Sequence, residues 1–302
     1  MPILEFGLSR VTMRREVTGD LALSAEEAAL LDNHSLLNLC NVLEMQLNLL
    51  ADKVECPSLR DFSRYCLDLI MELPQGNLAR HLPEMEIQCG RMQHQLKGLL
   101  GGHPEEVPVI HGLLETIAVG HARIREFKGD RLAWQGIPRE AFPNTLRQFL
   151  RATEKVSGGR FRFIQAPAPK AADAYWIDFR IEGPEGAIHA PGILHDTIRD
   201  LAGNARKYSE PGSSILIDLE SEPGGNLRLS VSDEGMGVPE EEMEKIVQFG
   251  YRGTNALDKR TMGGGFGLTK AYQLCRRFNG RFFIESEIGR GTRIEMTLLP
   301  PG

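Results

Sequence analysis

The chain has 302 residues, of which 41% are hydrophobic and 25% charged, and its formal net charge at pH 7 is −6. This length suits two domains with separate cores, and the acidic balance gives no general case for nucleic-acid binding. No run of 18 apolar residues indicates a membrane span, and no signal-peptide pattern opens the chain. Five cysteines without C-x-x-C spacing argue against a disulfide framework or a zinc site. We therefore expect a soluble, cytoplasmic protein with free thiols.

The first part of the chain predicts an arm followed by a helical domain. Residues 1–22 are too short for a sensor domain and are interpreted as an extended arm or a strand. Residues 23–130 are rich in Leu, Met, Glu, Gln and Ala and are punctuated by turn signals, a pattern typical of helices joined by short connections. The expected helices span about 24–54, 58–73, 77–100 and 105–128. No internal repeat is evident.

The first of these helices carries both a start signal and an apolar seam. Ser24 is a candidate N-cap, and Glu27 completes a capping box. Leucines recur at the heptad-like spacing that a bundle or coiled coil needs. These leucines are Leu36, Leu39, Leu43, Leu47 and Leu50. We predict an antiparallel bundle, built as a helical hairpin pair or as four helices.

The remaining residues, 131–302, mix helix and strand patterns and predict an α/β domain. The alternating run LRLSVSD places Asp233 at the end of a strand, where the chain turns. The segment Lys128–Pro138 contains two glycines and a proline, and we interpret it as the hinge between the two domains.

Within this second domain, DLAGNARKYS predicts a helix with a ligand-binding face. Asp200 and Asn204 are four residues apart, so they share a face and offer hard oxygen ligands for Mg²⁺. Lys207 could reach a phosphate, and Tyr208 offers a ring for stacking on a base. Taken alone, this block is equally consistent with an amphipathic helix whose polar face is solvated.

Three glycine-rich blocks follow in order: DEGMGVP, GGGFGL and GRGT. An ionised Asp233 accepts hydrogen bonds only, which suits an adenine amine, although an Asp that caps its own turn is the alternative. GGGFGL precedes an apolar-periodic helix, so its backbone N–H groups suit phosphates. The polar stretch before it, about 240–262, suits a mobile lid. Neither the G-x-x-x-x-G-K-[ST] motif nor the G-x-G-x-x-G fingerprint is present.

Together, the four blocks resemble the ATP-binding domain shared by gyrase-type topoisomerases, heat-shock chaperones of the ninety-kilodalton class, sensor histidine kinases and mismatch-repair ATPases. NARKYS and the short spacing are most similar to the histidine kinases. The resemblance implies an α/β-sandwich domain that binds ATP and Mg²⁺. The implied roles are Asn204 as metal ligand, Lys207 as phosphate contact, Tyr208 as adenine-side wall, Asp233 as reader of the adenine amine, Gly235 and Gly237 as shapers of the base pocket, Gly263, Gly265 and Gly267 as triphosphate lining, and Thr292 as a water-mediated base contact.

Two positions depart from the family pattern. Asp200 stands where histidine kinases usually have Asn or Glu, which leaves a liganding or base-like catalytic role open. In IVQFGYRG, Phe249 matches the anchoring aromatic of the family's phenylalanine block, and Val247 replaces its first aromatic.

The first helix also contains HSLLN, which resembles the phosphoacceptor box of histidine kinases. His34 would be the nucleophile toward the γ-phosphoryl group, and Asn38 stands four residues later, as in the family. Ser35 replaces the usual acid, which normally helps draw the proton from the imidazole. Asn38 could also orient a water that dephosphorylates a partner aspartate. The alternative for His34 is an ordinary surface histidine, and His121 is the second candidate acceptor.

The resulting prediction is a histidine kinase of a two-component system. It has an α+β architecture with a helical dimerisation and phosphotransfer domain (23–130) and a catalytic ATP-binding domain (131–302). The resemblance implies a homodimer through the N-terminal helices and a response-regulator receiver domain as partner. Because residues 1–22 are too short for a sensor domain, either the sensor is a separate protein or these residues were cut from a longer one. Two alternatives remain open: an ATP-binding phosphatase or regulatory partner without autokinase activity, and a serine kinase or ATPase of the same superfamily.

Overall fold

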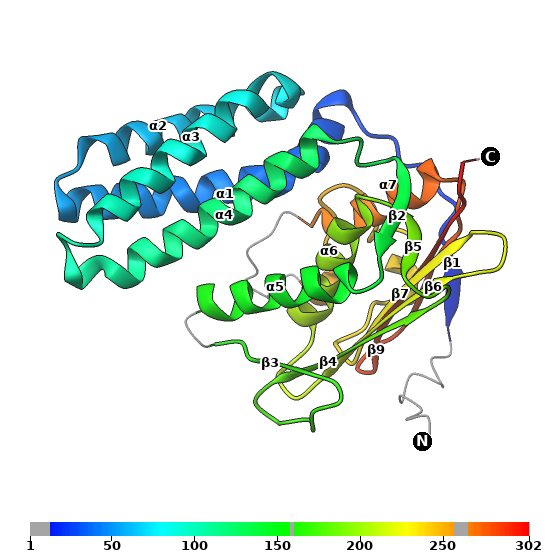
Figure 1. Ribbon diagram of the computed structural model, residues 1–302. Helices are drawn as coiled ribbons and strands as arrows, with labels where there is room; N and C mark the ends of the chain where they lie inside the picture. Colours follow the sequence, from blue (N-terminus) through cyan, green and yellow to red (C-terminus); the bar gives the residue numbers. More distant parts are fainter. Residues whose placement is uncertain (1–12, 158–159, 257–264, 302) are drawn as a thin grey trace. The chain divides into compact units, whose positions relative to one another are not determined.

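The computed structural model describes residues 13–157, 160–256 and 265–301, which form two compact units (Figure 1). The helical unit comprises residues 22–131. The sheet unit combines the segment before residue 22 with residues 132–302. A unit of helices together with a unit in which helices cover a mixed sheet confirms the predicted α+β class.

The helical unit contains four helices, and their bounds agree with the predicted ranges to within two residues. They are α1 (Ala25–Val54), α2 (Pro57–Glu72), α3 (Leu78–Leu99) and α4 (Val107–Lys128), with 3₁₀ turns η2 (Leu73–Gln75) and η3 (Pro104–Glu106). Contacts from Asn33 to Leu73 and from Ser63 to Glu44 show that α1 and α2 run antiparallel. Among the described residues, no helix has both the length and the apolar character needed to cross a membrane.

The predicted leucine seam forms the core of this unit. Leu36, Leu43, Leu47 and Leu50 are at most 2% exposed, and Leu39 packs against the same core with its side chain partly buried. Burying a leucine fully stabilises a fold by about 1.5–3 kcal/mol, so this stripe anchors α1 in the bundle. The seam prediction is confirmed.

The capping box at the start of α1 is also confirmed. Ser24 Oγ accepts a hydrogen bond from the Glu27 amide at 3.1 Å, and Glu27 Oε2 accepts one from the Ser24 amide at 2.8 Å. Each bond satisfies a backbone donor that the helix itself leaves unpaired.

We expect Ser24→Ala to lower the free energy of unfolding of the helical unit by about 1 kcal/mol, because it removes this cap. Ser35→Ala, which lies in the interior of the same helix, is the matched control. It should be neutral or slightly stabilising, since alanine has the higher helix propensity. Urea unfolding followed by circular dichroism measures both, and equal midpoints for the two variants would contradict the expectation.

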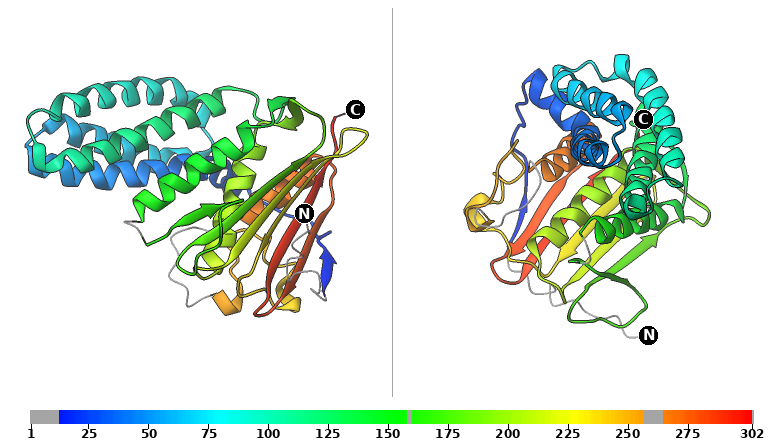
Figure 2. Two further views of the ribbon diagram at one scale, coloured as in Figure 1. Left: turned by 60° about the horizontal axis from the view of Figure 1, so that its bottom comes forward. Right: turned by 90° about the vertical axis from the view of Figure 1, so that its left-hand side faces the viewer.

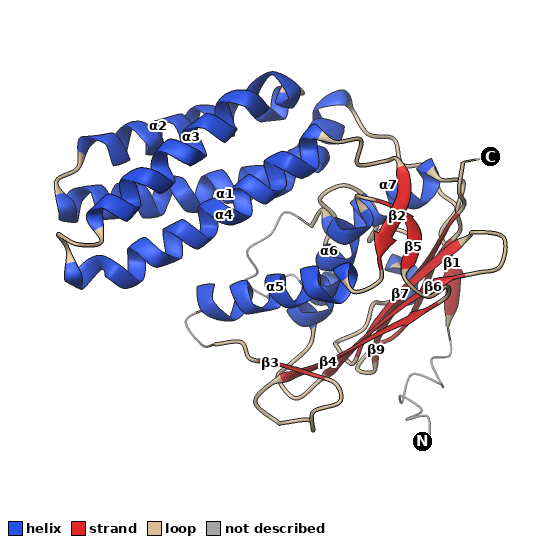
Figure 3. Ribbon diagram, viewed as in Figure 1, coloured by secondary structure: helices blue, strands red, loops and turns tan. Residues whose placement is uncertain are grey.

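The described residues of the sheet unit contain a seven-stranded sheet in the order β1-β8-β9-β7-β6-β4-β3 (Figures 1 and 3). Its strands are β1 (Arg14–Glu16), β3 (Phe163–Gln165), β4 (Tyr175–Glu182), β6 (Ser214–Ser221), β7 (Leu227–Asp233), β8 (Phe282–Glu287) and β9 (Gly291–Leu298). Helices α5 (Ala141–Val156), α6 (Leu194–Tyr208) and α7 (Gly267–Arg277) lie against one face of the sheet (Figure 2). A separate ribbon pairs β2 (Trp134–Pro138) with β5 (Ala187–Pro191).

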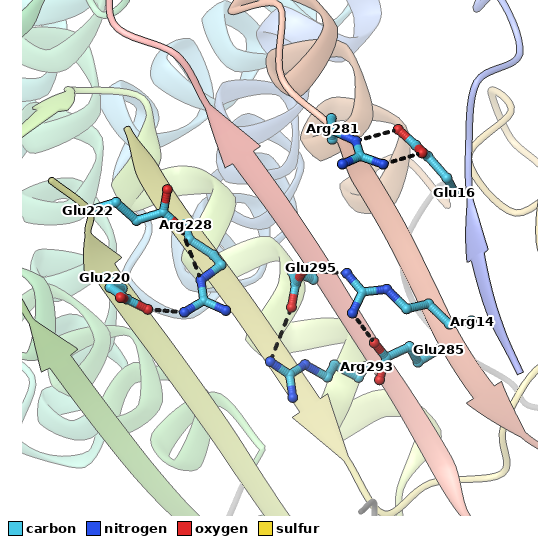
Figure 4. A network of polar contacts seen from close by, with 9 residues as sticks. All are labelled: Arg14, Glu16, Glu220, Glu222, Arg228, Arg281, Glu285, Arg293 and Glu295. Atoms are coloured by element: carbon cyan, nitrogen blue, oxygen red, sulfur yellow. Dashed lines mark hydrogen bonds and ion pairs between the residues drawn. The ribbon is translucent and has the colours of Figure 1, made fainter. Parts of the chain in front are cut away.

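Strand alternation separates the two faces of the sheet. On β7, the predicted inward residues Leu227, Leu229 and Val231 are at most 3% exposed and belong to the core beneath the helices. Their neighbours point to the opposite face, where charged side chains form separate groups of ion pairs (Figure 4). Arg14, for example, pairs with Glu295 at 2.7 Å and with Glu285 at 3.1 Å. Only the face beneath the helices therefore contributes to the described apolar core.

The first described residues belong to the sheet and not to a separate arm. β1 pairs antiparallel with β8 at the edge of the sheet. Val17 is 4% exposed in the core, and the Tyr272 hydroxyl donates a hydrogen bond to the Gly19 carbonyl at 2.5 Å. The sheet unit is therefore built from both sides of the helical unit in sequence.

The segment predicted as a hinge is only partly irregular. Its second half, Trp134–Pro138, is strand β2 and pairs with β5. Regular structure is absent only from residues 129–133, between the end of α4 and the start of β2. Any hinge on this side of the helical unit is thus confined to those five positions.

Candidate nucleotide-binding site

A cavity of about 100 Å³ lies in the sheet unit, beside the end of α6 and the end of β7. It has room for several water molecules. Six residues predicted from the sequence line it together, although they come from separate parts of the domain. They are Asn204 and Tyr208 on α6, Asp233 at the end of β7, Gly237 in the following loop, Gly265 just before α7 and Thr292 on β9. Their roles in binding stay predictions.

Asp233 is held at the floor of this cavity by backbone donors. Its Oδ1 accepts hydrogen bonds from the Gly235 amide at 2.8 Å and from the Thr292 amide at 3.3 Å. Burial raises the pKa of the Asp233 carboxyl to about 7, against the lowering influence of those two amides. Among the described residues no hydrogen bond reaches Oδ2, so that oxygen can accept one from a ligand N–H.

The walls of the cavity are mostly apolar. A flat heterocycle suits such walls, with one polar group to fix its orientation. The apolar lining comprises Leu201, Ala205, Val231, Met236, Val238, Ile246, Ala256, Leu268 and Ile294.

Two glycines let the backbone pass close to this site. A Cβ on Gly235 would lie 2.6 Å from the Tyr208 carbonyl oxygen and 2.7 Å from Asp233 Oδ1. Gly237 has φ +71°, and a Cβ there would lie 2.2 Å from the Glu287 carbonyl oxygen. Any side chain at either position would displace the cavity floor, which is the physical reason for glycine in DEGMGVP.

Besides Gly235, three predicted residues of the sheet unit do not line the cavity. Asp200 Oδ2 lies 3.4 Å from the Nζ of Lys270 on α7. Gly267 lies where α7 meets α6, since a Cβ there would be 3.2 Å from Asn204 Nδ2 and from Asp200 Cβ. Lys207 holds its ammonium 5.2 Å from the centre of the Tyr208 ring. Gly263, with most of GGGFGL, lies outside the described residues.

The lid segment contributes to the site as far as residue 256. Phe249 stacks on Phe266 with ring centres 4.7 Å apart, and Val247 is 3% exposed in the core. Tyr251 to Gly253 line the cavity. The rest of the predicted lid, 257–262, lies outside the described residues.

Arg252 is a candidate that the sequence patterns did not single out. It lines the cavity. Burial lowers the pKa of Lys207, and the positive charges of Arg252 and Arg206 lower it further. Two cations held near each other beside a cavity favour an anionic ligand. In the sequence, this residue is the cation of Tyr251-Arg-Gly253, between the second and third blocks.

The metal-binding groups at the cavity suit a Mg²⁺ ion that is bound partly by the protein and partly by a nucleotide. No cluster of three or more His, Cys, Asp or Glu side chains within the described ranges could hold a metal ion. Asn204 supplies an amide oxygen at the cavity, and Mg²⁺ typically keeps several waters and takes its other ligands from phosphates. The residues present therefore fit a metal that arrives with a nucleotide.

In the helical unit, His34 and Asn38 form the predicted i, i+4 pair on α1. Asn38 Nδ2 lies 3.0 Å from His34 Nε2, so the amide fixes the orientation of the ring. Asn38 is exposed and His34 is half-buried.

Comparison with known proteins agrees with this geometry. Residues 190–302 match the family described as histidine kinase-, DNA gyrase B- and HSP90-like ATPases. The sensor histidine kinase AruS of Pseudomonas aeruginosa is 33% identical over 39% of this chain and 12% of its own length. The histidine protein kinase SaeS of Staphylococcus aureus is 34% identical over 35% of this chain and 30% of its own length.

A third relative, the adaptive-response sensory kinase SasA of a Synechococcus strain, is 28% identical over 48% of this chain and 34% of its own length. The chain thus spans about a third or less of the curated relatives it matches. The matched region contains the α6 helix, Asp233 and the glycine blocks. Residues 190–302 therefore form a domain of the ATPase superfamily that joins histidine kinases, DNA gyrase B and HSP90, and two of the relatives named above are histidine kinases, which confirms the resemblance predicted from the sequence.

Proposed function

We propose that this protein is a two-component histidine kinase that uses MgATP to phosphorylate His34 and passes the phosphoryl group to an aspartate of a response-regulator receiver domain. The observation that carries this proposal is the joint presence, in one chain, of the nucleotide pocket around Asp233 and the His34–Asn38 pair on a bundle helix. We place these two domains in the cytoplasm.

Each group in the pocket has a proposed task. Asp233 accepts a hydrogen bond from the adenine amine, with Thr292 beside it. Asn204 would hold Mg²⁺ together with the phosphates of the nucleotide, and Arg252 and Lys207 would offset the phosphate charge. When bound, the metal would supply positive charge at the transferred phosphoryl, and the residues of the pocket would contribute positioning and electrostatics.

In the transfer step, an imidazole nitrogen of His34 forms a bond to the γ-phosphorus. The bond from that phosphorus to the oxygen bridging to the β-phosphate breaks, ADP leaves, and the imidazole loses its ring proton to solvent. Asn38 holds the ring by its 3.0 Å contact. Ser35 offers no carboxylate to take that proton, so we expect a slow reaction.

Ser35 also favours a second candidate. If the ring proton is not removed efficiently, the protein would bind ATP without autophosphorylation and act on a phosphorylated receiver domain, with Asn38 orienting the attacking water. Asn38 is exposed on α1, which is compatible with that role.

The test is incubation of the whole chain with γ-labelled ATP and Mg²⁺. We expect acid-labile label on the wild type, none on His34→Ala or Asn204→Ala, and undiminished label on His94→Ala. His94 is the matched control, because it is an exposed histidine on another helix of the same unit. Each variant is first checked for its fold by circular dichroism.

The outcomes separate the candidates. Label that survives acid would indicate a serine kinase instead. A wild type that binds ATP and remains unlabelled would refute the autokinase, and loss of phosphate from an added phospho-receiver domain would then support the phosphatase.

A further inference from the structure

The two halves of the helical unit have the same pattern of buried positions. The hairpin of α1 and α2 can be compared with that of α3 and α4. Several buried positions on α1 have an equivalent on α3 that lies a constant number of residues later in the chain. For the first helices the pairs are Leu36 and Met85, Cys40 and Cys89, Leu43 and Met92, and Leu47 and Leu96. None of these eight is more than 6% exposed.

The second helices repeat the pattern with a slightly larger offset, because the turn between α3 and α4 is longer. The pairs are Leu59 and Ile110, Phe62 and Leu113, Cys66 and Ile117, and Leu69 and Gly120. Both second helices also begin with the same short motif, Glu55-Cys-Pro57 in one and Glu106-Val-Pro108 in the other. The chain thus contains two copies of one hairpin design.

The apolar seams of the two hairpins are buried against each other. Side chains from all four helices form a single core cluster. Gly120 on α4 marks a close approach, since a Cβ there would lie 2.8 Å from Leu39 Cδ2 on α1 and 3.8 Å from Cys89 Sγ on α3. At one end, Lys53 of α1 pairs with Glu106, just before α4, at 2.8 Å. A lone hairpin would leave this seam exposed to water, and here it is covered within the chain.

The two hairpins differ in the residues that bear chemistry. By the offset of the first helices, His34 corresponds to Pro83 and Asn38 to Ile87. Proline has no nucleophile, and Ile87 is 49% exposed, so it is not a core residue. The second hairpin therefore keeps the packing of the first without its acceptor pair.

We infer that α3 and α4 take the place that the hairpin of a second copy would occupy, so that the protein is a monomer with a single acceptor face. The phosphoryl transfer proposed above then occurs within one chain; this second statement rests on the proposed function. The inference replaces the homodimer that the family resemblance implies.

The first test is the mass of the full chain in solution, by sedimentation and light scattering from dilute to concentrated samples. We expect 33.6 kDa throughout. A species of twice that mass would overturn the inference. This measurement does not depend on any activity.

A matched pair of variants on α3 tests the covering of the seam. Leu96 is fully buried and Ile87 half-exposed on the same helix. Leu96→Asp should unfold the helical unit or cause self-association, while Ile87→Asp should keep the mass and the melting temperature of the wild type. If Leu96→Asp kept both as well, α3 would not cover the seam and the inference would fail.

Subunit mixing tests where transfer occurs. His34→Ala keeps the nucleotide pocket, and Asn204→Ala keeps the acceptor. If transfer is confined to one chain, a mixture of the two stays unlabelled under conditions that label the wild type. Label in the mixture would show transfer between chains. If the wild type itself stayed unlabelled, the proposed function would have failed, and the mass would still decide whether the protein is a monomer.

Discussion

Asp233→Asn is expected to weaken ATP binding by about tenfold to a hundredfold. A hydrogen bond to a charged group contributes about 1.5–3 kcal/mol, and about 1.4 kcal/mol corresponds to a factor of ten in affinity. The asparagine amide also places donors where the adenine amine needs an acceptor. Titration calorimetry with MgATP measures the effect.

Asp218→Asn is the matched control for this substitution. Asp218 lies on β6, its pKa is also raised, chiefly by burial, and it does not line the cavity. It should therefore leave the affinity for ATP unchanged. Equal affinities for wild type and Asp233→Asn would remove Asp233 from the base site.

The raised pKa of Asp233 also predicts a pH dependence of binding. Because the free carboxyl has a pKa of about 7, it becomes protonated as the pH falls below neutrality and can no longer accept at both oxygens. The affinity of the wild type should fall more steeply between about pH 8 and pH 6 than that of Asp233→Asn, which reports only the ionisation of the nucleotide. Parallel profiles would contradict this.

The stability of the ligand-free protein should change in the opposite sense. The folded pKa of Asp233 lies above its ordinary value, so ionisation destabilises the fold; this cost is absent at low pH and fully present above about pH 7. Asp233→Asn should therefore match or exceed the wild-type melting temperature at about pH 8, and this advantage should shrink towards about pH 5. A less stable variant at the higher pH would mean that its loss of binding reflects misfolding.

Gly237→Ala is expected to destabilise the sheet unit by about 3 kcal/mol or more. A left-handed backbone costs a non-glycine residue roughly 1–2 kcal/mol, and overpacking adds about 1–3 kcal/mol. The added Cβ would lie 2.2 Å from the Glu287 carbonyl oxygen, so the turn after β8 must shift. ATP binding should be lost with it, because that shift deforms the cavity floor.

Gly250→Ala separates the two contributions. Gly250 has a similar φ of +68°, but no atom lies within 4 Å of the point that its Cβ would occupy. It should cost only about 1–2 kcal/mol and leave ATP binding intact. Differential scanning calorimetry should show a drop on the order of 10 °C for Gly237→Ala and a smaller one for Gly250→Ala. Equal drops would show that backbone conformation alone requires glycine at position 237.

Local signals account for what the sequence predicts well. The Ser24 cap and the leucine seam depend on residues within one helix, so their spacing suffices to place α1. Asp233 and the glycines around it were identifiable for a similar reason. The residues next to them in the sequence indicate a tight turn with a buried carboxylate. The fold then brings the separate blocks together in space.

Local sequence patterns do not predict features that depend on residues far apart in the chain. The ion pair between Asp200 and Lys270 joins two helices, and spacing along one helix pointed to a metal-ligand role for Asp200. The hairpin correspondence escaped detection because it preserves burial and not residue identity: Cys66, for instance, matches Ile117. A three-residue strand such as β1 is too short for alternation to reveal.

The position of β1 bears on how the ATP-binding half of the chain can be handled by itself. A contiguous fragment starting after the helical unit would lack β1 and would uncover the hydrogen-bonding groups of β8, together with the ring of Phe283, over which the Arg14 guanidinium lies at 4.2 Å. Bare strands of this kind act as templates for edge-to-edge aggregation. Strand β1 thus shields the edge of the sheet at β8. A fragment cut at the boundary after the helical unit would lack β1 and would be prone to aggregation.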